Sequence, residues 1–235
     1  SRLGRSRTSS KLFLEIYSGK TIFSIISKIF NLFHSVIIVF GYKFFTNKKK
    51  VENIKKIKLV RNRKYSTTNM VESLFLSKKK VNSSVVIVYS DIVFDLAIIK
   101  KIVQIKGSVI PLNKAWLKLW KQRMNKKNII KDAEDLKTKN GYLISIGNKI
   151  KKKLPKSQFM GIIKLTLSDY NKLYKFYKSL KDKRIQFTHF LDKSLSEKVI
   201  KLKYKNFNKL WAEVDTSKDL NVAKKIFKNE LSNSN

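Results

Sequence analysis

The sequence predicts an α/β protein with a mixed, mostly parallel sheet that carries helices on both faces. Short runs of apolar residues, typical of buried strands, alternate along the 235 residues with segments in which apolar residues recur every three or four positions, as in amphipathic helices. The chain contains no internal repeat and no linker-like stretch that would divide it. We therefore expect one domain covering residues 1–235.

Strands are expected where apolar, often β-branched residues follow one another. Val85–Tyr89 is the clearest run, and its composition predicts a central strand. Ser35–Phe40 is a similar run, and Gly41 ends it. The other expected strands cover residues 57–60, 108–111, 143–146, 161–165, 199–202 and 212–215.

Helices are expected where the apolar spacing changes to three and four, most clearly over Leu167–Leu180. Thr68 can cap a helix that runs to about Ser77, and Ser217 can cap a last helix to about Asn229. The remaining expected helices cover residues 20–32, 92–104, 116–123 and 188–197. The basic, polar stretches 47–56 and 148–156 are expected to be exposed.

The charge is strongly positive, with 53 Lys+Arg against 16 Asp+Glu and a formal net charge of +37. Such a field attracts polyanions, so a nucleic-acid-binding protein is one interpretation. Only seven of the cations are arginine, whose planar fork binds phosphates and bases best. The other interpretation is a composition biased toward Lys, Ile, Asn, Phe and Tyr. Lysines gathered in one patch would favour the first, and lysines spread over every helix the second.

Several classes of protein are excluded or disfavoured by composition. Cysteine is absent, which excludes a disulfide scaffold, a thiolate nucleophile and cysteine-ligated zinc. The longest uncharged run, Ile29–Tyr42, has 14 residues, whereas a spanning helix needs about 20 apolar residues. The N-terminus does not have the pattern of a secretion signal. We therefore expect a soluble, cytoplasmic protein.

Two acidic residues follow expected strands, where ligands bind in open α/β sheets. Asp91 comes after Val85–Tyr89, and Asp215 closes the short strand 212–215, with Glu213 two residues before it on the same face. Carboxylates placed in this way suit Mg²⁺, which takes one or two carboxylates together with substrate phosphates. Both aspartates could equally be helix N-caps, and spacing alone does not decide between the two roles.

A series of short motifs resembles the bacterial phosphocholine cytidylyltransferase-like group of nucleotidyltransferases. The opening Ser1-Arg2-Leu3-Gly4 is similar to the end of the phosphate-binding loop of that group, and Lys11 falls close to its Pro-Lys motif. The further strings, in the order of the group and over nearly the whole chain, are Gly19-Lys20-Thr21, Gly41-Tyr42-Lys43, Thr68 to Phe75, Ser90-Asp91-Ile92-Val93-Phe94, Trp116 with Trp120 and Arg123, Asp132-Ala133-Glu134, Ile146-Gly147, Met160-Gly161 and Trp211 to Asp215.

The resemblance implies a Rossmann-like nucleotidyltransferase fold from which the first strand and the start of the phosphate loop are missing. It implies transfer of CMP from CTP to a small phosphorylated or phosphonylated acceptor such as phosphocholine, with release of pyrophosphate. Mg²⁺ would be the cofactor, and Asp91 and Asp215, with Glu213 as a further ligand, would hold it. Arg2 and Lys11 would neutralise the phosphates. The implied nucleotide-binding residues are Ser1, Leu3, Gly4, Tyr42, Asn62 and Asn69.

The acceptor would lie among aromatic and acidic side chains. Trp116 and Trp120 share a helix face and Trp211 precedes the metal acids, so the three could form an aromatic wall for a quaternary ammonium group. Asp132 and Glu134 could face a cationic amine. The tryptophans could also be core residues, and the two acids could cap a loop or balance nearby lysines.

Three alternatives remain at this point. The nearest, within the same chemistry, is a sugar-1-phosphate nucleotidyltransferase. A relative that has lost catalysis is the second, and it would gain weight if Asp91 and Asp215 lay too far apart to share one ion. The third, from a different class, is a basic nucleic-acid-binding protein.

Overall fold

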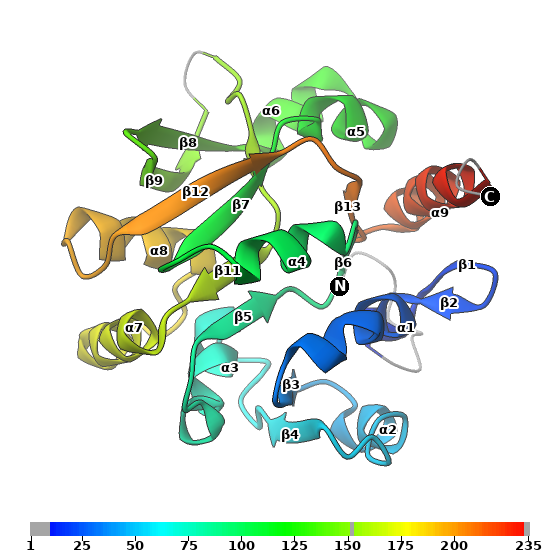
Figure 1. The fold of residues 1–235 in the computed structure, drawn as a ribbon. Coiled ribbons are helices and arrows are strands. Elements are labelled where there is room, and N and C mark those ends of the chain that lie inside the picture. The colour runs from blue at the N-terminus through cyan, green and yellow to red at the C-terminus, as the bar shows by residue number, and fades with distance from the viewer. Residues whose placement is uncertain (1–9, 151–152, 233–235) are drawn as a thin grey trace.

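The computed structural model describes residues 10–150 and 153–232, and the statements below concern these residues. The α/β class is confirmed, with a mixed seven-stranded sheet at the centre (Figure 1). Neighbouring strands follow the order β5 (Val85–Val88), β11 (Ile162–Leu165), β7 (Val109–Asn113), β12 (Leu202–Phe207), β9 (Tyr142–Lys149) and β8 (Glu134–Lys139), and β10 (Gln158–Phe159) also pairs with β7.

Strand directions differ from the expected, mostly parallel arrangement. Within the described part of the central sheet only β7 and β12 run parallel, and the other neighbours are antiparallel. One reason is local: β8 and β9 form a hairpin at Asn140-Gly141, where both residues have positive φ, 49° and 81°. Among the described residues, three two-stranded sheets lie outside the central sheet. They are parallel β3 (Val36–Phe40) with β4 (Ile57–Arg61), antiparallel β6 (Ile92–Phe94) with β13 (Trp211–Glu213), and antiparallel β1 (Glu15–Tyr17) with β2 (Lys20–Thr21).

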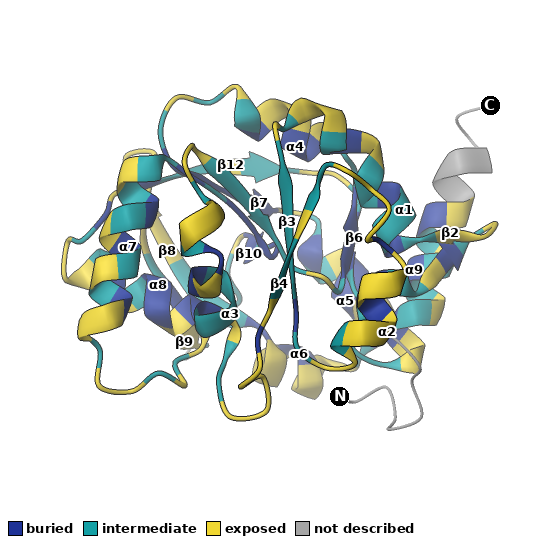
Figure 2. Cartoon of the chain, turned by 90° about the horizontal axis from the view of Figure 1, so that it is seen from below, coloured by how far each residue is buried: buried dark blue, intermediate teal, exposed yellow. Residues whose placement is uncertain are grey.

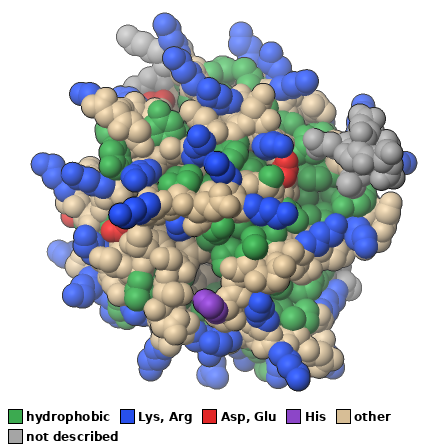
Figure 3. Space-filling view, viewed as in Figure 1, with side chains coloured by type: hydrophobic (Ala, Val, Ile, Leu, Met, Phe, Trp, Pro, Cys, Tyr) green, Lys and Arg blue, Asp and Glu red, His purple; other side chains and the backbone are tan. Residues whose placement is uncertain are grey.

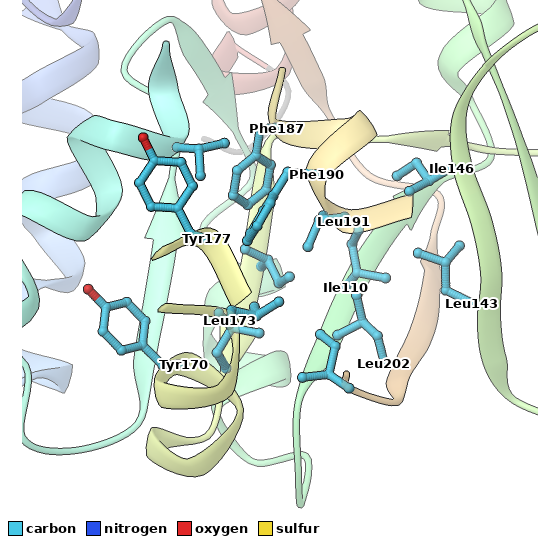
Figure 4. Close-up of a cluster of buried hydrophobic side chains, with 14 of the residues drawn as sticks. Ile110, Leu143, Ile146, Tyr170, Leu173, Tyr177, Phe187, Phe190, Leu191 and Leu202 are labelled. Atoms are coloured by element: carbon cyan, nitrogen blue, oxygen red, sulfur yellow. The ribbon is translucent and has the colours of Figure 1, made fainter. Parts of the chain in front are cut away.

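The helices cover both faces of the central sheet, as expected. They are α1 (Ile22–Ile26), α2 (Phe44–Lys49), α3 (Met70–Leu76), α4 (Ala97–Val103), α5 (Trp116–Arg123), α6 (Lys126–Asp132), α7 (Leu167–Ser179), α8 (Phe187–Ser196) and α9 (Ser217–Ser232), with 3₁₀ turns at Lys11–Phe13, Ser27–Leu32 and Lys78–Lys80. Alternation along β7 separates two cores: Ile110 and Leu112 pack with α3, α7 and α8 (Figure 4), whereas Val109 packs with α4, α5 and α6.

A third core joins the N-terminal elements to the C-terminal helix. Ile16 of β1 and Ile22 of α1 are fully buried together with Val93 of β6 and Ala223 of α9. Figure 2 draws buried residues in dark blue, and those of this cluster gather around α1 and α9. The cluster connects residues that are about 200 positions apart in the sequence, and it fixes the strands β6 and β13 that carry the acidic residues.

Several sequence expectations were wrong in detail. The helix expected to begin at about Ile92 or later begins at Ala97, because Ile92–Phe94 pairs with β13 as β6. The strand expected at 199–202 begins at Leu202 instead, and β5 lies at one end of the central sheet and not in its middle. Asn69, and not Thr68, is the N-cap of α3. The elements β1, β2, α2, α6, β8 and β10 were not among those expected from the sequence.

The surface carries lysines on most elements. On the face drawn in Figure 3, Lys and Arg are scattered over the surface and do not gather in one patch, the distribution that favours a composition bias. Among the helices of the described residues, none combines the length and the apolar character needed to cross a membrane.

Candidate active site

Two aspartates from distant parts of the chain lie together at the end of a strand pair. Asp91 is in the turn between β5 and β6, and Asp215 follows β13. The two strands pair antiparallel, with Ile92 opposite Glu213. The N–H of Val214 then donates to the carbonyl of Asp91 at 2.8 Å. Backbone pairing therefore brings the two acids to the same place.

The ammonium of Lys11 bridges the two carboxylates. Its Nζ lies 3.0 Å from Oδ2 of Asp91 and 2.5 Å from Oδ1 of Asp215. Burial lowers the pKa of Lys11, but the attraction of the two carboxylates outweighs this and the net pKa is raised. One positive charge thus sits between two acids that come from different strands.

The chemistry of this donor set fits a hard divalent cation. Mg²⁺ prefers oxygen ligands and commonly binds one or two carboxylates, with waters and substrate phosphates completing the shell. The ammonium of Lys11 lies within hydrogen-bond distance of both carboxylates, so the two share one positive charge. No cluster of three or more His, Asp or Glu side chains suited to a metal occurs in the described ranges, so Glu213 is not grouped with the pair as the expected third ligand.

Glu213 instead faces a buried arginine. Oε2 of Glu213 lies 3.5 Å from Nη1 of Arg123, whose side chain is only 5% exposed. Burial raises the pKa of Glu213 to about 7, and the nearby charge of Asp215 adds to this while Arg123 opposes it. Near neutral pH this carboxyl can therefore be present in either protonation state.

A cavity of about 310 Å³ opens beside these residues. Four acidic residues line it, namely Asp132, Glu134, Glu213 and Asp215, and none of its lining residues in the described part of the chain is Lys or Arg. In a chain with 53 cations and 16 acids, this reversal of sign is unusual. The other lining residues are Asn69, Met70, Tyr89, Ile92, Trp120, Gln158, Phe159, Met160, Gly161, Gln186, Phe187, Thr188 and Trp211.

The acidic wall is held in place by hydrogen bonds. Oγ1 of Thr188 donates to Oε1 of Glu134 at 2.8 Å, and Nε2 of Gln158 donates to the carbonyl of Glu134 at 2.7 Å. Burial raises the pKa of Glu134, and the bond from Thr188 partly offsets this rise. The pKa of Tyr89 is raised well above its usual value, first by burial and then by Glu134 and Glu213.

The three tryptophans divide between pocket and core. Trp120 and Trp211 line the cavity, with stacked rings whose centroids are 6.4 Å apart. Trp211 is anchored because its indole N–H donates to the carbonyl of Met160 at 3.0 Å. Trp116 does not line the cavity: it is 1% exposed, and its N–H donates to the carbonyl of Pro155. Trp116 therefore supports the wall formed by Trp120 from behind.

The expected nucleotide-binding residues are scattered. Asn69 caps α3 and lines the cavity. Asn62 is buried, and its amide donates to Thr68, in the same loop, and to Ser73 of α3. Tyr42 is exposed and away from the cavity lining. Ser1, Arg2, Leu3 and Gly4 lie outside the described residues.

Residues that the sequence reasoning missed form much of the cavity wall. Tyr89, Phe159 and Phe187 pack edge to face or in parallel, with ring centroids 5.7 to 6.4 Å apart. Gly161, which has a φ of 73°, approaches so closely that a Cβ there would lie 2.9 Å from Cδ2 of Tyr89. The positive φ could not be read from the sequence, although Met160-Gly161 was among the strings that carried the resemblance.

Comparison with known proteins places this geometry in context. No model of a protein family matches the chain. The chain is 31% identical over 179 residues to the CTP:phosphoglutamine cytidylyltransferase of Campylobacter jejuni subsp. jejuni serotype O:2. The matched region covers 68% of this chain and 69% of that protein.

Solved structures with the same fold include two proteins described as CTP-dependent transferases. The inositol-1-phosphate CTP transferase from T. maritima has a TM-score of 0.74 at 20% identity, covering 96% of this chain and 91% of that one. The CTP:phosphocholine cytidylyltransferase from Streptococcus pneumoniae has a TM-score of 0.70 at 16% identity, covering 97% and 94%. At these identities the likeness shows the fold.

Proposed function

The chain belongs to the cytidylyltransferase-like family of nucleotidyltransferases, and from this membership we propose that it transfers CMP from CTP to a small phosphorylated acceptor that carries a cationic group. The observation that supports this most directly is the meeting of Asp91 and Asp215 around one positive charge beside an acidic, aromatic cavity. The nearby arrangement of carboxylates suits a phosphate-transfer centre that uses Mg²⁺.

The reaction would be an in-line displacement at the α-phosphorus of CTP. An oxygen of the acceptor phosphate forms the new P–O bond, the bond between the α- and β-phosphates breaks, and its electron pair leaves with pyrophosphate. Catalysis of this kind consists of positioning and neutralising charge. Asp91 and Asp215 would hold the Mg²⁺, which supplies neutralisation of the phosphate oxygens when bound.

Lys11 has a part in the same scheme. Its Nζ already lies within hydrogen-bond distance of both carboxylates, so it is at the point where metal and phosphates would come together. As a compact, mobile ammonium it can turn from the carboxylates to the leaving phosphates without backbone movement. Arg2 would assist it according to the family resemblance.

The acceptor class is inferred from the sign of the cavity. A phosphate bound at the Lys11 end would leave the remainder of the acceptor near Glu134 and Glu213, beside the stacked rings of Trp120 and Trp211. Carboxylates and aromatic faces both attract an ammonium group, and each aromatic contact contributes about 0.5–2 kcal/mol. A neutral sugar phosphate can donate hydrogen bonds from its hydroxyls to these acids but gains no attraction between opposite charges, so the cavity favours a cationic acceptor over a sugar phosphate.

A pyrophosphate-release screen tests the proposal. The full chain is incubated with Mg²⁺ and each of the four nucleoside triphosphates, crossed with phosphocholine, phosphoethanolamine, 2-aminoethylphosphonate, phosphoglutamine, inositol-1-phosphate and glucose-1-phosphate. We expect release with CTP and an acceptor bearing an ammonium group, and its loss in D91N and D215N.

The control is D95N, since Asp95 pairs with the exposed Lys209 at 3.2 Å and is absent from the cavity lining. Its turnover should equal that of the parent chain. Preference for glucose-1-phosphate would refute the acceptor class, and full activity in D215N would refute the assignment of the acid pair.

A further inference from the structure

Arg123, the last residue of α5, is a buried cation beside the acid pair. Its Nε donates to Oδ1 of Asp219 at 2.7 Å, and both side chains are 5% exposed. Its Nη1 lies 3.5 Å from Glu213, and its Cζ lies 5.3 Å from the ring centroid of Trp120. One guanidinium therefore contacts two residues of the cavity wall, Glu213 and Trp120, and a second acid, Asp219, behind it.

Asp219 links this arginine to the backbone of Asp215. While Oδ1 accepts from Arg123, Oδ2 accepts from the N–H groups of Asp215 and Thr216, at 3.1 and 2.8 Å. Oγ1 of Thr216 in return accepts from the N–H of Asp219 at 3.2 Å. Burial alone would raise the pKa of Asp219, but the bonds from Arg123 and Thr216 lower it, so the carboxylate is ionised.

The chain contains a second helix start of the same kind, which serves as an internal comparison. At α7, the N–H of Asp169 donates to Oγ1 of Thr166 at 3.1 Å, and the Asp169 carboxylate accepts from the hydroxyl of Ser108. This Thr-x-x-Asp cap therefore forms with a neutral donor to the carboxylate, although the N–H of Thr166 donates to Ser108 and not to Asp169. Burying an arginine costs several kcal/mol unless it is well paired, so capping alone does not account for Arg123 at α9.

We propose that Arg123 and Asp219 form a positioning pair that holds Asp215 in register with Asp91 for the divalent ion. Asp219 fixes the turn that contains Asp215, because its Oδ2 accepts from the backbone N–H groups of Asp215 and Thr216. The other arm of Arg123 lies 3.5 Å from Glu213 at the cavity wall, an ion contact without a hydrogen bond. This inference rests on the proposed function, because it presumes that Asp91 and Asp215 bind the metal.

Direct metal binding tests the pair independently of turnover. Mn²⁺ is titrated into the full chain and its free concentration is followed by electron paramagnetic resonance, for the parent, D215N, R123M, R123K, D219N and D169N. Loss of a partner that orients a metal ligand typically weakens binding about 10- to 100-fold. We expect R123M and D219N to bind Mn²⁺ at least about tenfold more weakly, R123K to recover part of this loss, and D169N to bind like the parent.

Steady-state kinetics supply a second readout. In D219N the Mg²⁺ concentration for half-maximal rate should rise, and excess Mg²⁺ should restore most of kcat, whereas D169N should lower stability without changing the Mg²⁺ requirement. Parental Mn²⁺ affinity in R123M and D219N, with weak binding in D215N, would overturn the positioning role alone. Unchanged binding in D215N would overturn the metal site and this inference together. If R123M does not fold, D219N decides the matter.

Discussion

Replacing Lys11 by methionine separates the attraction within the acid pair from the packing around it. The change removes one ammonium and leaves the carboxylates of Asp91 and Asp215 facing each other, while the methionine retains most of the apolar stem. Side-chain exposures of 19%, 25% and 31% place this triad between a surface and a buried ion pair. Hydrogen bonds to charged groups contribute about 1.5–3 kcal/mol when buried, and exposed pairs about 0.2–1 kcal/mol.

From these limits we expect K11M to lower the free energy of unfolding by about 2 kcal/mol in the absence of divalent ions. For a chain of this size the corresponding fall in Tm is about 4–8 °C. Mg²⁺ should now bind without displacing an ammonium. Stabilisation by a ligand at ten times its Kd is about 1.4 kcal/mol, so Mg²⁺ should raise the Tm of K11M by about 3–6 °C, and that of the parent by less.

Thermal unfolding followed by circular dichroism, with and without Mg²⁺, measures both effects. The matched control is K48M, because Lys48 forms only an exposed pair with Glu52 at 3.5 Å. K48M should shift neither Tm nor the response to Mg²⁺ appreciably. An equal Mg²⁺ response in K11M and the parent would refute the view that Lys11 and the metal compete for the same carboxylates.

Three further predictions concern the cavity. The pKa of Glu213 is raised from 4.5 to about 7 in the folded protein, so its ionisation is less favourable there than in the unfolded chain. As the pH rises from 4.5 to about 7, the free energy of unfolding should therefore fall by up to about 3 kcal/mol. E213Q should flatten this part of a pH profile of denaturation measured in EDTA. G161A should lower the free energy of unfolding by about 1–2 kcal/mol, because residue 161 has a positive φ. The new Cβ should also displace the ring of Tyr89 toward the cavity, which should raise the KM of the acceptor more than the KM of CTP. W120L should raise the KM of an ammonium acceptor about 2- to 30-fold, whereas W116F should lower the Tm and leave that KM unchanged; the opposite ranking would contradict the division between wall and core.

The sequence was informative where a pattern is local. The apolar runs of β3 and β5 and the periodicity of α5 and α7 were predicted to within about a residue, since buried strands and amphipathic helices impose such patterns directly. Asn-Gly is a strong hairpin signal, and Asn140-Gly141 therefore indicates the antiparallel pair β8–β9, which was not among the expected elements.

Errors arose where apolar runs were ambiguous. Ile92–Phe94 and the apolar residues 96–99 are separated by Asp95 alone, and neither run is long enough to distinguish strand from helix spacing. The strand predicted over residues 199–202 begins only at Leu202, because the apolar pair Val199-Ile200 precedes the alternating segment Leu202 to Phe207 that forms β12.

The candidate site was only partly predictable for a physical reason. Asp91 and Asp215 follow strands, so their location at a sheet end could be inferred from residue order. The links from Arg123 to Asp219, or from Thr188 to Glu134, join residues 96 and 54 positions apart. Such contacts depend on how helices pack across the sheet, and no local pattern encodes them. The same applies to Trp116, whose helical spacing suits a wall or a core equally well.

The unpaired edges of β3 and β5 affect how readily the protein self-associates in solution. Within the described ranges β3 pairs only with β4 and β5 only with β11, so along one edge of each no described strand hydrogen-bonds to the amide and carbonyl groups. Such borders recruit other extended segments, whereas a formal charge of +37 keeps molecules apart. Added salt shortens the reach of that repulsion to about 10 Å at 0.1 M. Light scattering should therefore show dispersed particles in dilute buffer and growing assemblies as ionic strength increases.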